Sequence, residues 1–429
     1  MAATRVLYHT LQRLLRASTP LVGGGTSKVA RGISGRRGAA EGLVAWAGHT
    51  SPAGSRVWFH APSVGEGLQA RAVMEALQAR VPTMTPLFTH FSPSAEGFAR
   101  SIPAGWSGYL PWDVPEEMAP ALDALAPDLL VFTKTEVWPT LVEEASARRV
   151  PVALVAGSVP PGAGRARWPA RAFLRPAWAG LSLVAAVDEA DARGFRILGA
   201  QPETIHVTGD PGVDSAVARV RGGDPDAPYL RPFRADPRPT LVAGSTWRSD
   251  MAVLVPAFLR LRRRVPDARL VVAPHEPSER VVSALVRAMT AQGCQARSLT
   301  QVEEDGVQGV DVVLVDRVGI LARLYGLGRV AYVGGGFHRA GLHSVVEPAA
   351  AGVPVLFGPG HANARAAAAL LTVGGGREAG GSEALAEALV SWFVDASAHD
   401  YAASAALGYI DGHLGAADRT AALLEPLLT

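Results

Sequence analysis

The stretch VWFHAPSVGEGLQARAVMEAL, residues 57–77, decides the fold class of this chain. It starts as an apolar run that predicts a buried strand, breaks at residues 62–65, and continues with the periodicity of a helix. Glu66 lies where that helix should begin, and the helix dipole and free backbone N–H groups stabilise a carboxylate there. The stretch therefore predicts a strand–turn–helix unit, and it leaves two roles open for Glu66, a helix cap or a catalytic base.

The same alternation of apolar runs and helix-like patterns continues along most of the chain and is typical of α/β proteins. The first half predicts helices such as 67–79 and 139–148, and strands at residues 57–60, 85–89, 129–133, 152–156, 183–187 and 205–207. The pattern then restarts, with predicted strands at residues 240–243, 269–273, 311–315, 330–333 and 353–357.

Residues 221–239 are rich in Pro, Asp and Gly and predict a linker between the two halves. We therefore expect two doubly wound domains, at residues 41–220 and 240–429. Ligands of such folds bind beyond the carboxyl ends of the strands, and two such domains would form a cleft.

Composition excludes several classes of protein. Apolar residues make up 48% of the 429 residues, which is typical of a folded chain. The net charge of +2 gives no support for a nucleic-acid partner. Cys294 is the one cysteine, so a disulfide framework and a cysteine-based zinc site are both excluded within a single chain.

The first 40 residues are basic and contain no acidic residue before Glu41. Leu7, Leu11, Leu14 and Leu15 recur at helical spacing, and no run of about 18 apolar residues predicts a membrane-spanning helix. The pattern favours an amphipathic helix on an anionic membrane surface. A mitochondrial transit peptide, which is also rich in Arg and poor in acid, and a mobile tail are the alternatives.

Polar or small residues follow the predicted strands at several places. Because parallel strands end at one edge of a sheet, these residues are candidates for binding or catalysis. In the first half they are Ser63, Glu66, Ser92, Ser94, Lys134 and Glu136, and in the second half Ser245, Thr246, His275, Gly334, Gly335 and Gly336.

The stretch VAYVGGGFHRAGLHSVVEPAAAGVPVLFGP, residues 330–359, carries the most information about a ligand. Its three glycines would let a ligand approach the backbone closely. We expect Leu342, His343 and Ser344 at the start of a helix that holds a phosphate, with Glu347 one turn in and able to accept the hydroxyls of a ribose. The alternative is a capping residue before a solvated helix face. The glycines do not have the spacing of the dinucleotide-binding fingerprint, which argues against hydride transfer.

The remaining candidates also have simple structural alternatives. His275 could contact a nucleotide, or it could be an ordinary histidine after a strand. Glu136 could share acid–base work with Glu66, or it could pair with Lys134 or a nearby Arg at the surface. The turn at Ser245 and Thr246 could hold a phosphate or cap a helix.

With these motifs in order, the chain resembles the 3-deoxy-D-manno-octulosonic acid (Kdo) transferases of lipopolysaccharide biosynthesis. The resemblance extends from about residue 57 to about residue 370. It rests on HAPSVGE, FTHFSPSAEG, TKTEVWPTL, VDEADARGFRILGAQPETIHVTGD, GSTW, APHEP, DRVGILARLYGLGRVAYVGGGF and GLHSVVEPAAAGVPVLFGP.

The resemblance implies a GT-B fold, two Rossmann-like domains with the active site between them. It implies a membrane-associated glycosyltransferase that inverts the anomeric configuration of the sugar without a metal ion or cofactor. The implied donor is CMP-Kdo and the implied acceptor is a lipid A precursor. The implied location is the cytoplasmic face of the bacterial inner membrane, as a peripheral or monotopic protein. The resemblance makes residues 1–40 the membrane-associating segment.

The resemblance also implies roles for individual residues. Glu66 matches the general base, and Glu136 a second acidic residue on the acceptor side, where we also expect Ser63, Ser92, Ser94 and Lys134. Glu347 matches the carboxylate on the donor ribose. The remaining donor residues would be Ser245, Thr246, His275, Gly334, Gly335, Gly336, His343 and Ser344.

Several positions depart from the family pattern. The family usually has His, Arg, Asn and Glu where this chain has Trp247, His275, Ser344 and Ile320, and its basic-aromatic-Asp motif is replaced at residues 211–214. Three arginines could replace the missing charge at the donor phosphate, namely Arg248, Arg317 and Arg339. The departures leave open a GT-B glycosyltransferase with another nucleotide sugar, and a membrane-associated member without turnover.

Overall fold

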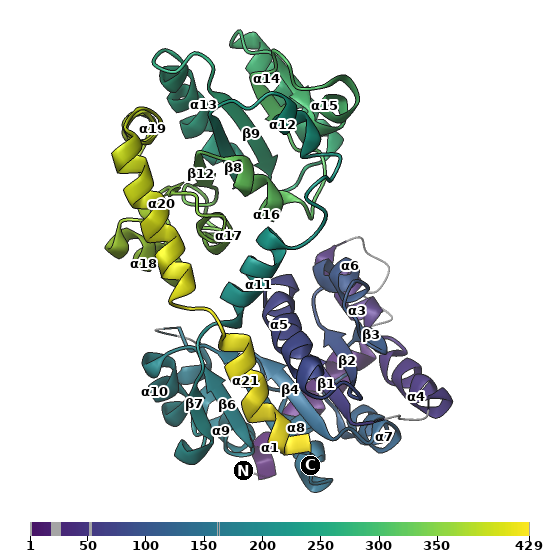
Figure 1. The fold of residues 1–429 in the computed structure, drawn as a ribbon. Helices are drawn as coiled ribbons and strands as arrows, with labels where there is room; N and C mark the ends of the chain where they lie inside the picture. The colour runs from purple at the N-terminus through teal and green to yellow at the C-terminus, as the bar shows by residue number, and fades with distance from the viewer. Residues whose placement is uncertain (1, 19–26, 51–53, 161, 163, 429) are drawn as a thin grey trace. The chain divides into compact units, whose positions relative to one another are not determined.

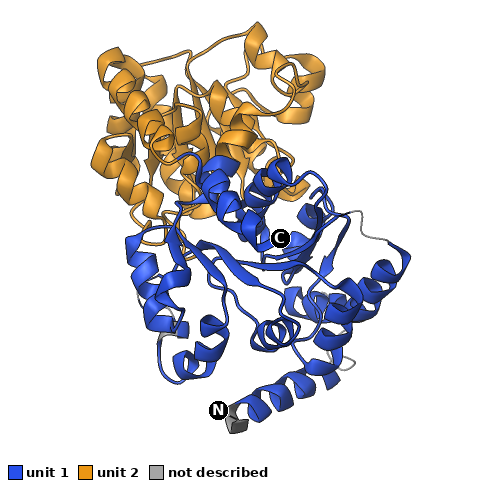
Figure 2. Ribbon diagram, turned by 60° about the horizontal axis from the view of Figure 1, so that its bottom comes forward, with its two compact units in different colours: residues 1–215, 414–429 blue, residues 216–413 orange. Residues whose placement is uncertain are grey.

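The computed structural model describes residues 2–18, 27–50, 54–160, 162 and 164–428, and Figure 1 shows their helices and strands. The chain divides into two compact units (Figure 2). Unit 1 comprises residues 1–215 and 414–429, and unit 2 comprises residues 216–413.

Unit 1 is built on a seven-stranded parallel sheet with the strand order β3-β2-β1-β4-β5-β6-β7. Its strands are β1 (Arg56–His60), β2 (Thr85–His90), β3 (Trp106–Tyr109), β4 (Leu129–Thr133), β5 (Val152–Gly157), β6 (Leu183–Ala186) and β7 (Ile205–Val207). Along β1 the side chains alternate, so that Trp58 belongs to one core cluster and Val57 and Phe59 to another.

Helices of unit 1 follow most of these strands. They are α1 (Ala2–Ala17), α3 (Lys28–Gly35), α4 (Ala39–His49), α5 (Val64–Arg80), α6 (Glu96–Ala99), α7 (Pro115–Leu125), α8 (Pro139–Ala147), α9 (Ala170–Ala179), α10 (Glu189–Leu198) and α21 (Ala416–Leu424), with short 3-10 helices η1 (Pro93–Ala95), η2 (Gly164–Ala166), η3 (Pro202–Thr204) and η5 (Glu425–Leu428). Helix α11 (Pro211–Arg221) begins in unit 1 and ends in unit 2.

Unit 2 repeats this plan with a second seven-stranded parallel sheet, in the order β10-β11-β9-β8-β12-β13-β14. Its strands are β8 (Thr240–Thr246), β9 (Arg269–Pro274), β10 (Ala296–Ser298), β11 (Val312–Leu314), β12 (Val330–Val333), β13 (Val355–Phe357) and β14 (Gly376–Glu378). Its helices are α12 (Arg231–Ala235), α13 (Arg248–Arg262), α14 (Glu279–Ala291), α15 (Leu299–Asp305), α16 (Leu321–Leu324), η4 (Tyr325–Leu327), α17 (Val346–Ala350), α18 (Arg365–Val373), α19 (Ser382–Val394) and α20 (Ala396–Asp411).

Each strand predicted from the sequence is present. The inner strands could be predicted because they are buried on both faces and are therefore continuous apolar runs. Three further strands, β3, β10 and β14, were not predicted. They lie at sheet edges, and most of their residues are partly or fully exposed. Their sequences WSGY, ARS and GRE consequently carry no apolar signal.

The unit boundaries differ from the predicted ranges at the C-terminus, because residues 414–429 belong to unit 1. Helix α21, yellow in Figure 1, packs against α5. Its Ala421 and Leu424 share a core cluster with Val57 and Phe59 of β1. Arg419 Nε also donates to the Thr208 carbonyl at 2.9 Å.

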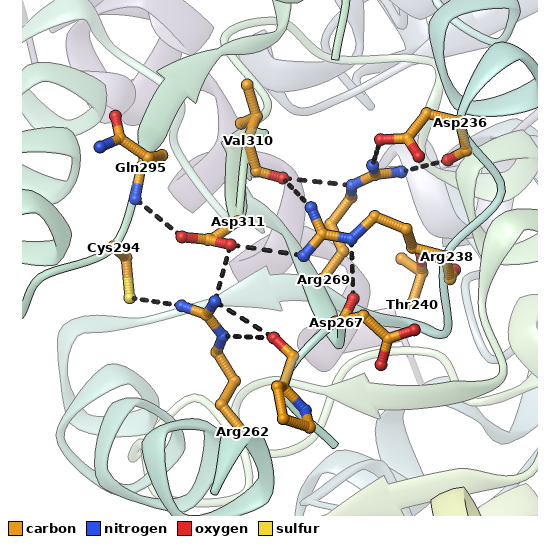
Figure 3. Close-up of polar contacts among 11 residues, drawn as sticks. Asp236, Arg238, Thr240, Arg262, Asp267, Arg269, Cys294, Gln295, Val310 and Asp311 are labelled. Carbon is orange, nitrogen blue, oxygen red and sulfur yellow. Dashed lines mark hydrogen bonds and ion pairs between the residues drawn. The ribbon is translucent and has the colours of Figure 1, made fainter. Parts of the chain in front are cut away.

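The predicted linker, residues 221–239, is assigned to unit 2. Figure 3 shows how its end is fixed. The buried guanidinium of Arg269 on β9 contacts Asp236 at 2.5 Å. Arg238 shares the Asp311 carboxylate with Arg262, at 3.3 and 2.8 Å. The segment thus has the composition of a linker, but ion pairs with partly or fully buried side chains hold its end against unit 2.

The basic N-terminal segment contains the predicted helix, α1, and that helix packs on unit 1. Tyr8 donates to the Asp113 carboxylate at 2.7 Å, and Arg16 pairs with Glu117 at 2.7 Å. The leucines at positions 7, 11, 14 and 15 remain exposed. No helix in the described part of the chain is long and apolar enough to cross a membrane.

Candidate functional site

The candidate residues of each unit lie where the strand order of its sheet reverses. In unit 1 the reversal falls between the neighbouring strands β1 and β4, and Glu66 and Glu136 follow these strands. In unit 2 it falls between β8, whose last residues are Ser245 and Thr246, and β12, which ends at the glycine run. Ligands of open parallel sheets bind at this point, beyond the carboxyl ends of the strands.

Glu66 lies in the first turn of α5, as predicted. Its Oε2 accepts a hydrogen bond from the Ser63 hydroxyl, and its Oε1 lies 3.2 Å from Lys134 Nζ. Burial raises the pKa of Glu66, but the Ser63 hydrogen bond and the Lys134 charge outweigh burial, so its net pKa is lowered. The carboxylate is therefore ionised at neutral pH and held in one orientation.

Glu136 has the opposite electrostatic environment. Burial raises its pKa, and the nearby negative charge of Glu66 raises it further, while Arg165 at 3.3 Å lowers it only in part. Both carboxylates have side chains that are only 18% exposed. Two neighbouring carboxylates whose pKa values are shifted apart can take different roles in proton transfer.

Lys134 reaches Glu66 from an unusual backbone conformation. Its φ is +68°, in the left-handed region that side chains rarely adopt, and its N–H donates to the Val155 carbonyl at 2.8 Å. Such conformations cost about 1–3 kcal/mol and cluster at functional sites. Lys134 is thus a partner of Glu66. Glu136 pairs with Arg165, in agreement with the alternative of a nearby Arg, and not with Lys134.

The predicted acceptor residues Ser92 and Ser94 are connected to this site through the backbone. The N–H of Ser92 donates to the Pro62 carbonyl at 2.8 Å, next to Ser63. The hydroxyls of Ser92 and Ser94 lie 2.8 Å apart, and both residues are partly exposed. The loops after β1 and β2 therefore bring the predicted serines to one edge of the sheet.

Two buried residues near this site, His60 and Arg36, were not among the residues predicted from the sequence. His60, the last residue of β1, accepts a hydrogen bond on Nε2 from Trp138 at 3.2 Å. Burial lowers its pKa from 6.5 to about 3, so the ring is neutral. Arg36 lies 5.4 Å from the Trp138 ring and lowers the pKa of Glu136. Its signal was hidden in the basic segment that was assigned to the membrane.

The glycine run of unit 2 is required by internal packing. A Cβ on Gly334 would lie 2.4 Å from the Ser245 carbonyl oxygen, and one on Gly335 would lie 2.2 Å from the Gly341 carbonyl oxygen. Gly335 also has φ +99° and donates its N–H to the buried Asp250 at 2.9 Å. The glycines were predicted for close approach of a ligand, and the structure gives them a second role, close approach of neighbouring backbone.

Aromatic and imidazole rings gather beside this turn. The Trp247 ring stacks on His338 at 4.0 Å and on His275 at 4.4 Å, and His275 stacks on His343 at 4.6 Å. Trp247 Nε1 donates to His343 Nε2 at 3.0 Å. Burial, followed by the neighbouring His275, lowers the pKa of His343. Trp247 therefore organises the predicted donor histidines.

The turn predicted at Ser245 and Thr246 is wrong, because both residues belong to the end of strand β8, where the pairing with β9 is shifted by a bulge, and Trp247 caps the next helix. This strand end nevertheless offers a free polar group. Ser245 has φ +53°, and Thr246 is 4% exposed. Within the described part of the chain, Thr246 Oγ1 has no hydrogen-bond partner. An unpaired buried hydroxyl is costly, so a ligand oxygen at this position would relieve that cost.

The predicted helix start at Leu342, His343 and Ser344 is wrong. Helix α17 begins at Val346, and these three residues precede it in a loop. The N–H of His343 donates to the Gly334 carbonyl at 3.1 Å, so the loop follows the glycine turn instead of coiling. The predicted phosphate contact with a helix N-terminus is therefore wrong at Leu342, His343 and Ser344, because no helix begins at these residues.

Glu347 lies in the first turn of α17 and forms an ion pair with Arg219 at 2.7 Å. Burial raises its pKa, and Arg219 lowers it in part. Of the three arginines considered for the donor phosphate, Arg317 pairs with Glu303. Arg248 begins α13 directly after Trp247, and Arg339 follows His338.

Comparison with known proteins links these sites to one family. A family model described as 3-Deoxy-D-manno-octulosonic-acid transferase matches residues 33–215. A 3-deoxy-D-manno-octulosonic acid transferase of Bordetella pertussis is 31% identical over 392 residues, which cover 88% of this chain and 89% of that protein. The protein of the same name from Haemophilus influenzae is 27% identical and covers 70% of each chain.

Solved structures at low identity show the fold. A UDP-GlcNAc 2-epimerase from Neisseria meningitidis aligns with a TM-score of 0.62 at 13% identity, over 87% of this chain and 99% of that one. One described as a putative UDP-N-acetylglucosamine 2-epimerase, from Listeria monocytogenes, aligns with a TM-score of 0.61 at 15% identity, over 86% and 95%. With two seven-stranded parallel sheets, the chain has the GT-B fold.

Proposed function

The chain belongs to the 3-deoxy-D-manno-octulosonic acid transferase family, and from this premise we propose that it transfers Kdo from CMP-Kdo to a lipid A precursor. The observation that supports the transfer step most directly is the pair Glu66 and Glu136, with pKa values shifted in opposite directions. Both follow strands at the reversal of the sheet in unit 1.

Glu66 acts as the general base in this proposal. It takes the proton of the acceptor hydroxyl as that oxygen bonds to the anomeric carbon of Kdo. The bond from that carbon to the CMP phosphate breaks, and its electron pair leaves with CMP. The lowered pKa keeps Glu66 ionised, and displacement of Lys134 by the acceptor would make it a stronger base. A single displacement of this kind inverts the anomeric centre and needs no metal ion.

Glu136 acts as an orienting residue for the acceptor. Its raised pKa makes it the carboxyl of the pair that gains a proton first as pH falls. A protonated carboxyl donates a hydrogen bond, whereas the ionised Glu66 accepts one. Ser63, Ser92, Ser94 and Lys134 supply further polar contacts in this proposal.

Unit 2 binds the donor in this proposal. The Glu347 carboxylate accepts hydrogen bonds from the ribose hydroxyls, and its ion pair with Arg219 holds the carboxylate in position. The CMP phosphate lies near the unpaired Thr246 hydroxyl and the His275 and His343 rings. In this proposal, hydrogen bonds from the Thr246 hydroxyl and the imidazole rings take the place of some of the contacts that an arginine supplies elsewhere in the family.

In this proposal helix α1 attaches the enzyme to the membrane. Leu7, Leu11 and Leu14 are 68%, 53% and 63% exposed on a helix whose Tyr8 and His9 contact unit 1. An exposed apolar helix face inserts into the headgroup region of a bilayer. We assign the chain to the cytoplasmic face of the bacterial inner membrane as a peripheral or monotopic protein.

The experiment is transfer with a purified lipid A precursor and CMP-Kdo made in situ, with the lipid product analysed by mass spectrometry. We expect a mass gain of one or more Kdo units, and thermal stabilisation by CMP but not by UDP. Absence of a Kdo adduct, together with stabilisation by UDP in place of CMP, would refute the proposal.

A further inference from the structure

A pocket in unit 1 has no assigned role in the transfer step, although one of its lining residues, Arg36, also lowers the pKa of Glu136. It has a volume of about 350 Å³ and lies where the last turns of α1 meet the corner between α3 and α4. Trp112 forms part of its wall. Its charged lining residues are Arg13, Arg16, Arg36, Arg37, Glu41 and Glu117.

Arg36 is the fixed cation of this pocket. It is 4% exposed, and its Nε and Nη2 donate to the Leu110 and Pro111 carbonyls at 3.0 and 2.7 Å. Its guanidinium stacks on Trp112 at 4.2 Å. Among the described residues, no carboxylate lies within ion-pair distance of Arg36, and Asp113 and Glu117 act on it only from further away. Burial outweighs these two negative charges and lowers the pKa of Arg36 to about 10. A buried cation whose charge is only partly compensated favours an anionic ligand.

The lining carries more positive than negative charge. Four guanidinium groups face two carboxylates, which gives a formal excess of +2. Arg16 pairs with Glu117 at 2.7 Å, and Arg13 pairs with Glu116 outside the pocket. A phosphomonoester carries a charge of about −1.5 to −2 near neutral pH, and arginine matches its oxygens with paired N–H donors.

The same helix carries an apolar face. Arg13, Arg16 and Ala17 line the pocket, and Leu7 and Leu14 of α1 are exposed. A ligand held here by phosphate thus lies next to a surface that suits acyl chains. A free phosphate ion would leave that surface unused.

We propose that the pocket binds the phosphomonoester group of a lipid, with its acyl chains along the exposed leucines of α1. Two lipids have this chemistry, a phosphorylated glycolipid acceptor and a phosphomonoester lipid of the bilayer. The first source rests on the proposed function, and the second does not.

Vesicle binding of the full chain tests the pocket without any transfer reaction. Vesicles of phosphatidylcholine contain either phosphatidic acid, a phosphomonoester, or phosphatidylglycerol, a phosphodiester, at matched surface charge. We expect roughly tenfold tighter binding to phosphatidic acid, because a pocket discriminates phosphate ester types and a diffuse basic surface does not. The Arg37→Ala and Arg16→Ala variants should lose this preference and retain binding to phosphatidylglycerol.

The control is Arg193→Ala, on the exposed face of α10 and outside the pocket, which should retain the preference. Thermal unfolding of every variant confirms that the fold is intact. Equal binding of the wild type to both vesicles, or an undiminished preference in both pocket variants, would overturn the proposal.

Transfer kinetics then identify the source of the phosphate. If the acceptor supplies it, removing the acceptor's phosphates should raise KM several-fold in the wild type, and Arg37→Ala should show little further response. If a bilayer lipid supplies it, both acceptors should give the same KM while the vesicle preference persists. Loss of all transfer would refute the proposed function, whereas the vesicle result would still decide the pocket.

Discussion

The candidate site of unit 1 and that of unit 2 occupy the same place in two sheets of the same topology, but they are built from different groups. In unit 1, Glu66 and Glu136 each pair with a cation, Lys134 and Arg165. In unit 2 the corresponding loops carry glycines and stacked rings, among them Trp247. The first arrangement suits proton transfer, whereas the second suits the retention of a ligand.

A shared detail makes the difference clearer. In each unit an indole N–H donates to a histidine Nε2, from Trp138 to His60 and from Trp247 to His343. His60 is fully buried, whereas His343 is partly exposed beside the glycine turn. The same pair of side chains thus supports the core in unit 1 and faces the candidate site in unit 2.

The largest expected effect on activity comes from substitution of Glu66. Glu66→Gln keeps the shape and the hydrogen-bonding capacity of the side chain but removes the base, so kcat should fall by about 10²–10⁴-fold. Binding of CMP, measured by calorimetry, should be unchanged because the variant lies in unit 1. Glu75→Gln on the same helix, at an exposed ion pair with Arg71, is the matched control and should keep full activity. A Glu66→Gln enzyme with near-normal kcat would exclude Glu66 as the base.

Substitution in the glycine turn should affect unit 2. Gly335→Ala places a Cβ 2.2 Å from the Gly341 carbonyl oxygen at a φ of +99°, so we expect a loss of at least about 2 kcal/mol in unfolding free energy and weaker CMP binding. Urea unfolding measures the first effect and calorimetry the second. Gly326→Ala, where an added Cβ would meet nothing within 4 Å, is the control. Unchanged stability of Gly335→Ala would contradict the packing role.

A smaller effect is expected at Glu347. Glu347→Gln weakens acceptance of the ribose hydroxyls and leaves Arg219 without its ion pair, so CMP affinity should fall by roughly tenfold. The exposed Glu387→Gln on α19 should bind CMP as the wild type does. If the wild type bound 2′-deoxy-CMP as tightly as CMP, the proposed contact between Glu347 and the ribose hydroxyls would be contradicted.

The smallest effect at neutral pH is that of His60, which appears only in the pH dependence of stability. The pKa of His60 is lowered to about 3 in the folded state, whereas in the unfolded chain it is near 6.5. The unfolded state therefore gains a proton first as pH falls, and the contribution of His60 to stability, complete above pH 6.5, is lost progressively toward pH 3. His60→Gln should flatten this part of the curve of unfolding free energy against pH. An identical slope in wild type and variant would contradict a neutral, buried His60.

The sequence predicted the features that depend on local pattern. The runs of β1 and β4 are apolar throughout because both faces are buried, and this placed Glu66 and Glu136 correctly after their strands. The start of α17 was not predictable in this way, since a loop at His343 is set by its backbone contact with Gly334, which is distant in the sequence.

Two further features depend on tertiary packing. Arg36 resembles the other arginines of the N-terminal segment in sequence, and only its burial against Trp112 distinguishes it. The return of residues 414–429 to unit 1 was also not predicted, because a short helix such as α21 carries no signal that identifies its packing partner.

Helix α21 has a consequence for biosynthesis of the protein. Arg80 of α5 pairs with Glu425 at 2.8 Å, and Leu424 completes the core beneath β1. Unit 1 contains the proposed general base, but its core closes only after residues 414–429 have left the ribosome. A chain interrupted anywhere in unit 2 would therefore carry Glu66 on an incomplete core, exposed to cellular proteases. Translation of the whole of unit 2 thus precedes completion of unit 1.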